Sequence, residues 1–182
     1  MGYPRTKWSL WAPGIDHFAR PTDSLATYAA AGRVRRNFQG YTTDDASAFV
    51  GPGASAIGRL SQGYVQNVVA TADYARAIRS GELATARGFE LTDNDRIRAA
   101  VIENLMCEFG FSLQELREAF GTRVDPIAEI AAELRRDDSD GFTSFDGQQF
   151  AVTVDGRPFV RTIAARFDQY YRPGNGRHSA AV

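Results

Sequence analysis

The 182-residue sequence contains one cysteine, Cys107, and only two histidines, His17 and His178. A single cysteine cannot form a disulfide within the chain, nor can it alone hold a cysteine-ligated zinc or iron–sulfur centre. Two histidines do not suffice for a histidine-rich metal site. No apolar run reaches the roughly 18 residues that a membrane-spanning helix requires. The sequence therefore predicts neither a disulfide scaffold, nor a Cys/His metal centre of its own, nor a membrane span.

The chain is close to neutral, because 21 Lys and Arg side chains are balanced by 22 Asp and Glu side chains. With 43% hydrophobic and 24% charged residues, its composition is typical of a globular protein. A net charge of −1 favours neither a nucleic-acid partner nor an anionic membrane. The opening residues 1–7 lack the apolar run of a secretory signal, so the predicted location is cytoplasmic.

Basic residues exceed acidic ones in the N-terminal half and the reverse holds in the C-terminal half, which predicts a domain boundary near residues 91–92. Three helices are expected beyond it. The first and second begin at capping boxes, residues 92–95 and 112–115, and the third begins with Asp125 as the cap before Pro126. Apolar side chains follow each start at helical spacing: Ile97, Val101, Leu105 and Phe109; Leu113, Leu116 and Phe120; Ile127, Ile130 and Leu134.

A β-hairpin is expected next, because two β-prone runs flank Asp146 and Gly147. A last helix is expected over residues 159–171, with Phe159, Phe167 and Tyr170 on its buried stripe. Three helices followed by a hairpin match the order of a winged helix, a common DNA-binding module. The acidic or balanced runs at residues 114–118 and 129–133 disfavour contact with phosphates, so a small packing domain of this shape is preferred.

The N-terminal half has weaker patterns. Short helices are expected at residues 23–31 and 71–79, and residues 63–67 have the composition of a strand. The run from residue 35 to residue 43 is rich in hydrogen-bonding groups and aromatic rings. Such a run is typical of a loop that shapes a pocket, or of an ordinary surface loop.

Gly51, Gly53 and Ala56 match the dinucleotide-binding fingerprint, and Asp73 follows at a suitable distance. However, Pro52 stands in the turn, and no alternating strand–helix pattern follows, which disfavours a doubly wound nucleotide-binding domain. The preferred interpretation is a strand whose glycines let a ligand approach the backbone.

Two side chains with chemical potential are interpreted as structural. Cys107 lies beside the apolar stripe of a predicted helix, which favours a buried, inert thiol. Asp16 and His17 are neighbours in a segment that reads as a strand, where adjacent side chains point to opposite faces. They are therefore not expected to act as an acid–base pair.

Residues 36–42, Arg-Asn-Phe-Gln-Gly-Tyr-Thr, closely resemble a motif of the oxygen-independent coproporphyrinogen III oxidases, which are radical S-adenosylmethionine enzymes of haem synthesis. Residues 16–21, 53–57 and 64–67 resemble further segments of the same family in the same order. The predicted helices from Thr92 and over residues 159–171 resemble its C-terminal domain. The resemblance covers roughly residues 14–172.

The resemblance implies a fold and a site. In the family, a partial (β/α) barrel holds a [4Fe–4S] cluster and S-adenosylmethionine, and a helical C-terminal domain covers it. A 5′-deoxyadenosyl radical starts the oxidative decarboxylation of two substrate propionates to vinyl groups, giving protoporphyrinogen IX. By resemblance, Phe38, Gln39 and Ile57 contact S-adenosylmethionine. Arg35 and Arg36 are candidates for binding the propionates of coproporphyrinogen III, the alternative being a solvated surface pair.

This chain departs from the family in lacking the C-x-x-x-C-x-x-C run that ligates the cluster, and most barrel strands. The expected fold is therefore α+β. Residues 1–91 are expected to be the C-terminal part of a radical S-adenosylmethionine barrel, residues 92–172 a winged-helix-like domain with one hairpin, and residues 173–182 a frayed tail.

The expected function is that of the C-terminal portion of such an oxidoreductase, inactive alone, with no catalytic or metal-ligating residue in this chain. The substrate and an electron donor would be partners of the parent enzyme, and cut barrel edges are expected to favour self-association. The alternative is a non-catalytic accessory protein or a tetrapyrrole-binding protein derived from that family.

Overall fold

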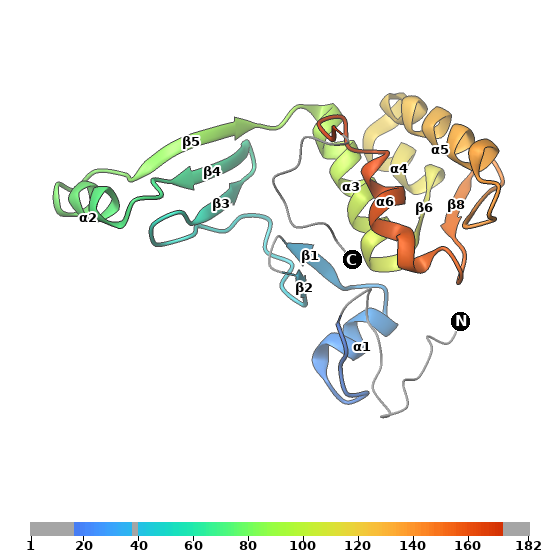
Figure 1. Ribbon diagram of the computed structural model, residues 1–182, viewed down its shortest axis with the longest axis horizontal. Helices are drawn as coiled ribbons and strands as arrows, with labels where there is room; N and C mark the ends of the chain where they lie inside the picture. Colours follow the sequence, from blue (N-terminus) through green and yellow to red (C-terminus); the bar gives the residue numbers. More distant parts are fainter. Residues whose placement is uncertain (1–16, 38–39, 173–182) are drawn as a thin grey trace. The chain divides into compact units, whose positions relative to one another are not determined.

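The computed structural model describes residues 17–37 and 40–172 (Figure 1). Helices and strands are mixed, so the expected α+β class is confirmed at that level. The chain divides into two compact units. One comprises residues 1–43 and 97–182, and the other is Asp44–Arg96.

The larger unit contains two sets of elements. Its N-terminal part has α1 (Ser24–Ala30) and a hairpin of β1 (Arg35–Asn37) and β2 (Gly40–Thr42). Its C-terminal part has, in chain order, α3 (Asp93–Glu108, entering this unit at Ile97), β6 (Gly110–Ser112), α4 (Leu113–Phe120), η1 (Gly121–Val124), α5 (Asp125–Asp137), β7 (Thr143–Phe145), β8 (Gln149–Val152), η2 (Arg157–Phe159) and α6 (Val160–Ala165).

The predicted capping box at Thr92 is confirmed, and so is Ser112 as the N-cap of α4. The Asp95 amide donates to Thr92 Oγ1 at 3.2 Å, and the Thr92 amide donates back to Asp95 Oδ2 at 2.8 Å. At α4 the Glu115 amide donates to Ser112 Oγ at 3.3 Å. These bonds occupy amides that the first turn of a helix leaves without an intrahelical acceptor.

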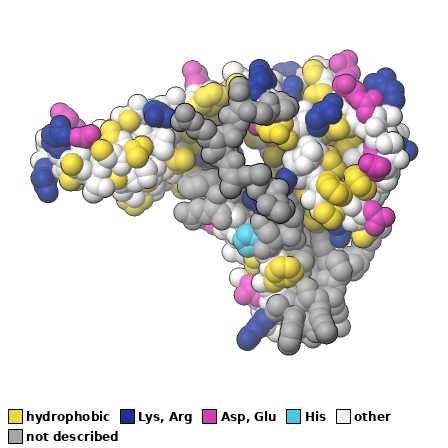
Figure 2. Space-filling view, viewed as in Figure 1, with side chains coloured by type: hydrophobic (Ala, Val, Ile, Leu, Met, Phe, Trp, Pro, Cys, Tyr) yellow, Lys and Arg dark blue, Asp and Glu magenta, His cyan; other side chains and the backbone are white. Residues whose placement is uncertain are grey.

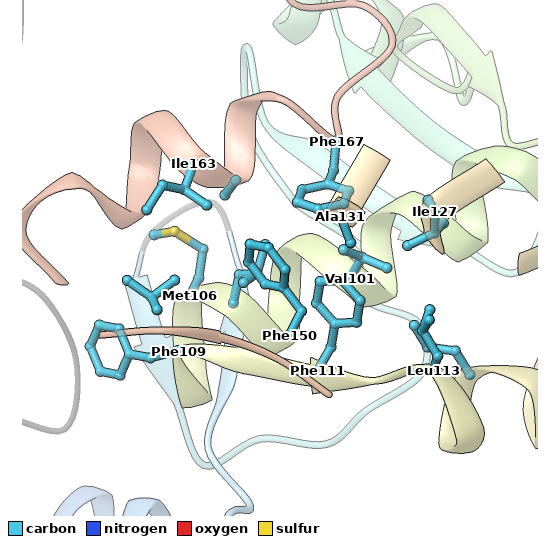
Figure 3. Close-up of a cluster of buried hydrophobic side chains, with 14 of the residues drawn as sticks. Val101, Met106, Phe109, Phe111, Leu113, Ile127, Ala131, Phe150, Ile163 and Phe167 are labelled. Carbon is cyan, nitrogen blue, oxygen red and sulfur yellow. The ribbon is translucent and has the colours of Figure 1, made fainter. Parts of the chain in front are cut away.

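The core of the larger unit lies between helices α3 to α6 and a three-stranded antiparallel sheet ordered β6-β8-β7. The predicted stripe of α3 is buried here, with Ile97, Val101 and Leu105 almost fully covered. The Phe111 and Phe150 rings stack at 5.2 Å between centroids, and Phe167 meets both rings edge-on (Figure 3). Because these side chains come from strands and helices far apart in sequence, they hold the C-terminal elements together.

Several predicted boundaries need correction. Asp125 is the first residue of α5 rather than its cap. The last helix is the short α6, which ends at Ala165, and both Phe159 and Tyr170 are about half exposed. The run from residue 35 to residue 43 was predicted to be a loop. It contains the β1–β2 hairpin instead, in which Arg36 pairs with Tyr41.

The smaller unit, Asp44–Arg96, holds β3 (Ile57–Leu60), β4 (Gly63–Asn67), α2 (Thr71–Arg79) and β5 (Thr85–Glu90). The strands form an antiparallel sheet in the order β3-β4-β5. Ala84 is the one buried hydrophobic residue within Asp44–Arg96, whereas Val50, Val69 and Leu83 are largely exposed. Figure 2 shows hydrophobic side chains scattered over the surface of the molecule. Strand pairing and loop hydrogen bonds, rather than a large core, therefore hold this unit together.

All strand pairs within the described residues are antiparallel. The strands of a (β/α) barrel are parallel and joined by helical crossovers. The β1–β2 and β3–β4 pairs are antiparallel because the links within them are too short for such a crossover, and the barrel remnant expected within residues 1–91 stays a prediction.

Candidate functional site

The β1–β2 hairpin and α3 meet through Glu103. The Arg36 amide donates to Glu103 Oε1 at 3.3 Å, and Arg35 Nη1 lies 3.6 Å from Glu103 Oε2. The Arg35 side chain is 58% exposed, so this ion pair is screened by solvent and adds little to stability. Its role is directional, since it orients Arg35 while leaving much of the guanidinium open to solvent.

Tyr41 anchors the second strand of the hairpin. Its hydroxyl donates to the Met106 carbonyl at 2.7 Å, near the end of α3, where carbonyls lack an intrahelical partner. The His17 ring meets the Tyr41 ring edge-on at 5.0 Å. Gly40 adopts φ +140°, and a Cβ there would lie 2.8 Å from His17 Nε2. The glycine of the motif is thus required both by its backbone conformation and by the packing of His17.

Arg36 is half-buried in this cluster, and one of its guanidinium nitrogens is fully covered. Its guanidinium lies 5.1 Å from the centre of the Tyr41 ring. Arg36 Nη1 is buried and has no hydrogen-bond partner among the residues that the structure describes. A buried guanidinium nitrogen without an acceptor is costly, so a carboxylate oxygen at this atom would remove a penalty as well as add a bond.

Ile57 opens β3 in the smaller unit, opposite Gln66 on β4. Before it, residues 51–56 form an irregular loop rather than the predicted strand. Asn67 Nδ2 donates to the carbonyls of Gly51 and Gly53, at 3.1 and 2.9 Å. The Gly53 amide donates to the Tyr74 hydroxyl at 2.9 Å. The loop before Ile57 therefore has a defined conformation.

Of the predicted site residues, Arg35 and Arg36 lie together on β1 beside Glu103, and Ile57 lies in the other unit. Phe38 and Gln39 lie outside the described residues. Four residues that shape these sites were missed: Tyr41, Glu103, Asn67 and Tyr74. Tyr41 and Asn67 stand in the motif runs, but no local pattern in the sequence indicates Glu103, whose partners are 67 and 68 residues away.

Comparison with known proteins gives these sites a context. A family model described as the HemN C-terminal domain matches residues 91–159. A solved structure of coproporphyrinogen III oxidase (HemN) from Escherichia coli, described as a radical SAM enzyme, superposes with a TM-score of 0.81 at 35% identity, covering 90% of this chain and 38% of that one. The chain resembles the C-terminal portion of this oxidase.

The curated relatives that the sequence matches are also coproporphyrinogen III oxidases. The oxygen-independent coproporphyrinogen III oxidase of Bradyrhizobium diazoefficiens is 48% identical over 169 residues, which cover 93% of this chain and 38% of the relative. The protein of the same name from Cereibacter sphaeroides strain ATCC 17025 is 44% identical over 172 residues, which cover 92% of this chain and 37% of the relative. The chain thus spans less than two-fifths of the length of these oxidases.

The residues present do not fit the iron–sulfur cluster of a radical SAM oxidase. Cys107 is the only cysteine, and it is 5% exposed within the larger unit. Burial and, secondarily, the nearby Glu103 carboxylate raise the pKa of its thiol to about 12. Such a cluster needs several cysteine thiolates, so the chain cannot build one from its own side chains. Among the described residues, no group of three or more His, Cys, Asp or Glu side chains could hold a metal ion.

Burial also raises the pKa of Glu108, at the end of α3, and the nearby Glu115 acts in the same direction. The Glu108 carboxylate faces Gly32, where an added Cβ would lie 3.5 Å from Glu108 Oε1.

Within residues 17–37 and 40–172, no helix is long and apolar enough to cross a membrane.

Proposed function

We propose that this chain supplies the C-terminal portion of an oxygen-independent coproporphyrinogen III oxidase, in which two propionates of coproporphyrinogen III are decarboxylated to vinyl groups. The observation that carries the proposal is the joint match of sequence and fold over nine-tenths of the chain. Because the chain cannot ligate the cluster, we propose that it is inactive by itself. A cytoplasmic location and an electron donor as partner belong to the same proposal.

In this proposal, Ile57, Phe38 and Gln39 contact S-adenosylmethionine. When bound, this cofactor supplies the 5′-deoxyadenosyl radical that takes hydrogen from a substrate propionate. An aliphatic side chain can line an adenine pocket, an aromatic face can stack on the base, and an amide can pair with its polar edge. The described part of the site is compatible with this role, because Ile57 is partly exposed and a Cβ at Gly53 would meet nothing within 4 Å.

Arg35 and Arg36 bind substrate carboxylates in this proposal. The buried Nη1 atom of Arg36 supports the assignment, since an ionised propionate would supply the acceptor that the described residues lack. Arg35 is exposed and oriented by Glu103. A guanidinium offers two parallel donors that match the two oxygens of a carboxylate.

We further propose that residues 1–91 form the C-terminal part of the barrel of the parent enzyme and residues 92–172 its helical, winged-helix-like C-terminal domain. The family match over residues 91–159 supports this division. The order α3, β6, α4, α5, β7, β8, with the sheet order β6-β8-β7, supports a winged-helix-like shape. Self-association through exposed strand edges stays a prediction.

A chimera tests the function. In the full-length Bradyrhizobium diazoefficiens relative, this chain replaces the portion that it matches over 169 residues. We expect the purified chimera to convert coproporphyrinogen III to protoporphyrinogen IX, measured anaerobically by porphyrin fluorescence after oxidation. The rate should lie within about tenfold of the parent enzyme, since tenfold corresponds to only ~1.4 kcal/mol of transition-state stabilisation.

The contradicting result is a chimera that folds and carries its cluster as the parent does but makes no product. If the isolated chain also bound coproporphyrin III tightly, the accessory alternative would replace the proposal. In an active chimera, Arg35→Gln and Arg36→Gln should each raise KM for coproporphyrinogen more than they lower kcat. An unchanged KM in both variants would remove these arginines from the substrate site.

A further inference from the structure

We infer that Asn67 is a positioning residue, which fixes the loop of residues 51–56 and thereby sets the place of Ile57. The inference rests on the proposed contact of Ile57 with S-adenosylmethionine. Asn67 itself touches neither cofactor nor substrate in the proposed site. A set of hydrogen bonds within the smaller unit supports its positioning role.

The loop has a backbone conformation that needs outside support. Ser55 has φ +61°, which is uncommon for a residue with a Cβ. Gly51 approaches Ile57 so closely that a Cβ at position 51 would lie 2.7 Å from the Ile57 carbonyl oxygen. A short loop closed on itself in this way persists only where its surroundings fix it.

Asn67 alone supplies three of the hydrogen bonds that hold the loop. Both polar contacts of its Nδ2 atom go to the loop, to the carbonyl oxygens of Gly51 and Gly53. Its backbone amide donates to the Ala56 carbonyl at 3.0 Å. Three loop carbonyls are therefore held by one residue.

Asn67 is the last residue of β4 and lies where the pairing with β5 becomes irregular. Gln66 pairs with Arg87 and Asn67 with Thr85, so Ala86 of β5 has no partner on β4. A bulge of this kind increases the local twist of a strand pair. Asn67 thus ends β4 at an irregularity of the sheet, within hydrogen-bond distance of the loop that it holds.

Further bonds complete the support. The Tyr74 hydroxyl, on α2, accepts from the Gly53 amide at 2.9 Å. The Ser55 amide donates to the Val68 carbonyl at 2.8 Å, and Gln66 Nε2 donates to the Ser55 carbonyl at 3.3 Å. Because Ile57 follows directly on this loop, a change in the loop moves the start of β3.

Aspartate at position 67 is the sharpest substitution. It has the size of asparagine and keeps the backbone bond to Ala56, but an ionised carboxylate only accepts hydrogen bonds. Its oxygens would face the carbonyl oxygens of Gly51 and Gly53, to which Asn67 now donates. Asn94→Asp is the matched control, because it makes the same charge change at an exposed position in the first turn of α3, away from the loop.

The test uses the chimera. For Asn67→Asp we expect KM for S-adenosylmethionine to rise at least tenfold, since a displacement of about 1 Å can cost about 100-fold. KM for coproporphyrinogen should stay within twofold of the unsubstituted chimera, and Asn94→Asp should change neither constant. Amide hydrogen exchange at Gly53 and Ser55 should become faster in Asn67→Asp.

Ile57→Ala tests the proposed contact with S-adenosylmethionine separately from the positioning role of Asn67. If Ile57→Ala leaves KM for S-adenosylmethionine unchanged, the proposed contact is wrong and the inference falls with it. If Ile57→Ala raises that KM but Asn67→Asp does not, the inference alone is overturned. Equal changes in the KM of both substrates in Asn67→Asp would indicate general destabilisation and would also overturn it.

Discussion

Alkylation of Cys107 by iodoacetamide at pH 8 should be about 1,000-fold slower in the folded chain than in the unfolded chain. The thiolate is the reacting species, and moving the pKa from 9.0 to about 12 lowers its fraction at pH 8 by that factor. Limited access to a side chain that is 5% exposed slows the reaction further. Mass spectrometry of the labelled chain measures the rate.

The control is the same reaction in concentrated urea, where the cysteine should react at the ordinary rate of a free thiol. A folded-state rate within tenfold of that control would contradict the buried, protonated thiol. It would also reopen the question of whether Cys107 can ligate iron.

The raised pKa has a consequence for stability. Below pH 9 the thiol is protonated in both folded and unfolded chains, so it contributes no pH dependence. As pH rises from 9.0 towards about 12, the unfolded chain releases the proton while the folded chain retains it. The stabilising contribution of the buried thiol is therefore lost across that window. Cys107→Ala removes this part of the pH dependence, which a comparison of urea unfolding of the two proteins measures.

Phe150→Ala should lower the free energy of unfolding of the larger unit by about 3–5 kcal/mol. Phe150 is 1% exposed, and its ring contacts those of Phe111 and Phe167 (Figure 3). It also contacts the Phe145 ring. Truncation removes apolar contacts and leaves a cavity between the sheet and α6, which the surrounding side chains can fill only in part. Urea unfolding followed by far-UV circular dichroism measures the loss.

The matched control is Phe159→Ala. Phe159 is 48% exposed and stacks on Phe142 at 4.7 Å, so about 1 kcal/mol is expected. Equal losses for the two variants would contradict the placement of the core around Phe150.

The C-terminal elements could be predicted because their signals are local. The capping box at Thr92 and the Asp146 turn between β7 and β8 each act over a few residues. The three-residue strand β6 could not be predicted, because its pairing partner β8 lies some 40 residues further along the chain. The last helix was predicted too long, since helical spacing alone cannot tell that Tyr170 is exposed.

In the candidate sites, too, the residues with a local sequence signal could be predicted and their distant partners could not. Arg36 and Ile57 stand in runs that resemble a known family, and Arg35 directly precedes the first of these runs, so the three residues could be identified from the sequence. Their neighbours could not be identified, because Glu103 reaches Arg35 only when α3 and β1 are folded together. The role of Asn67 likewise could not be predicted, because its side chain bonds to Gly51 and Gly53, which lie 16 and 14 residues earlier in the chain.

The most direct measurement is the release of 5′-deoxyadenosine from S-adenosylmethionine, by the isolated chain and by the chimera, after reconstitution with iron and sulfide and reduction with dithionite. The account predicts release by the chimera and none by the isolated chain, whose single buried cysteine cannot hold a cluster. Release by the isolated chain, together with cluster absorbance, would contradict it, as would a folded chimera that carries its cluster and releases none.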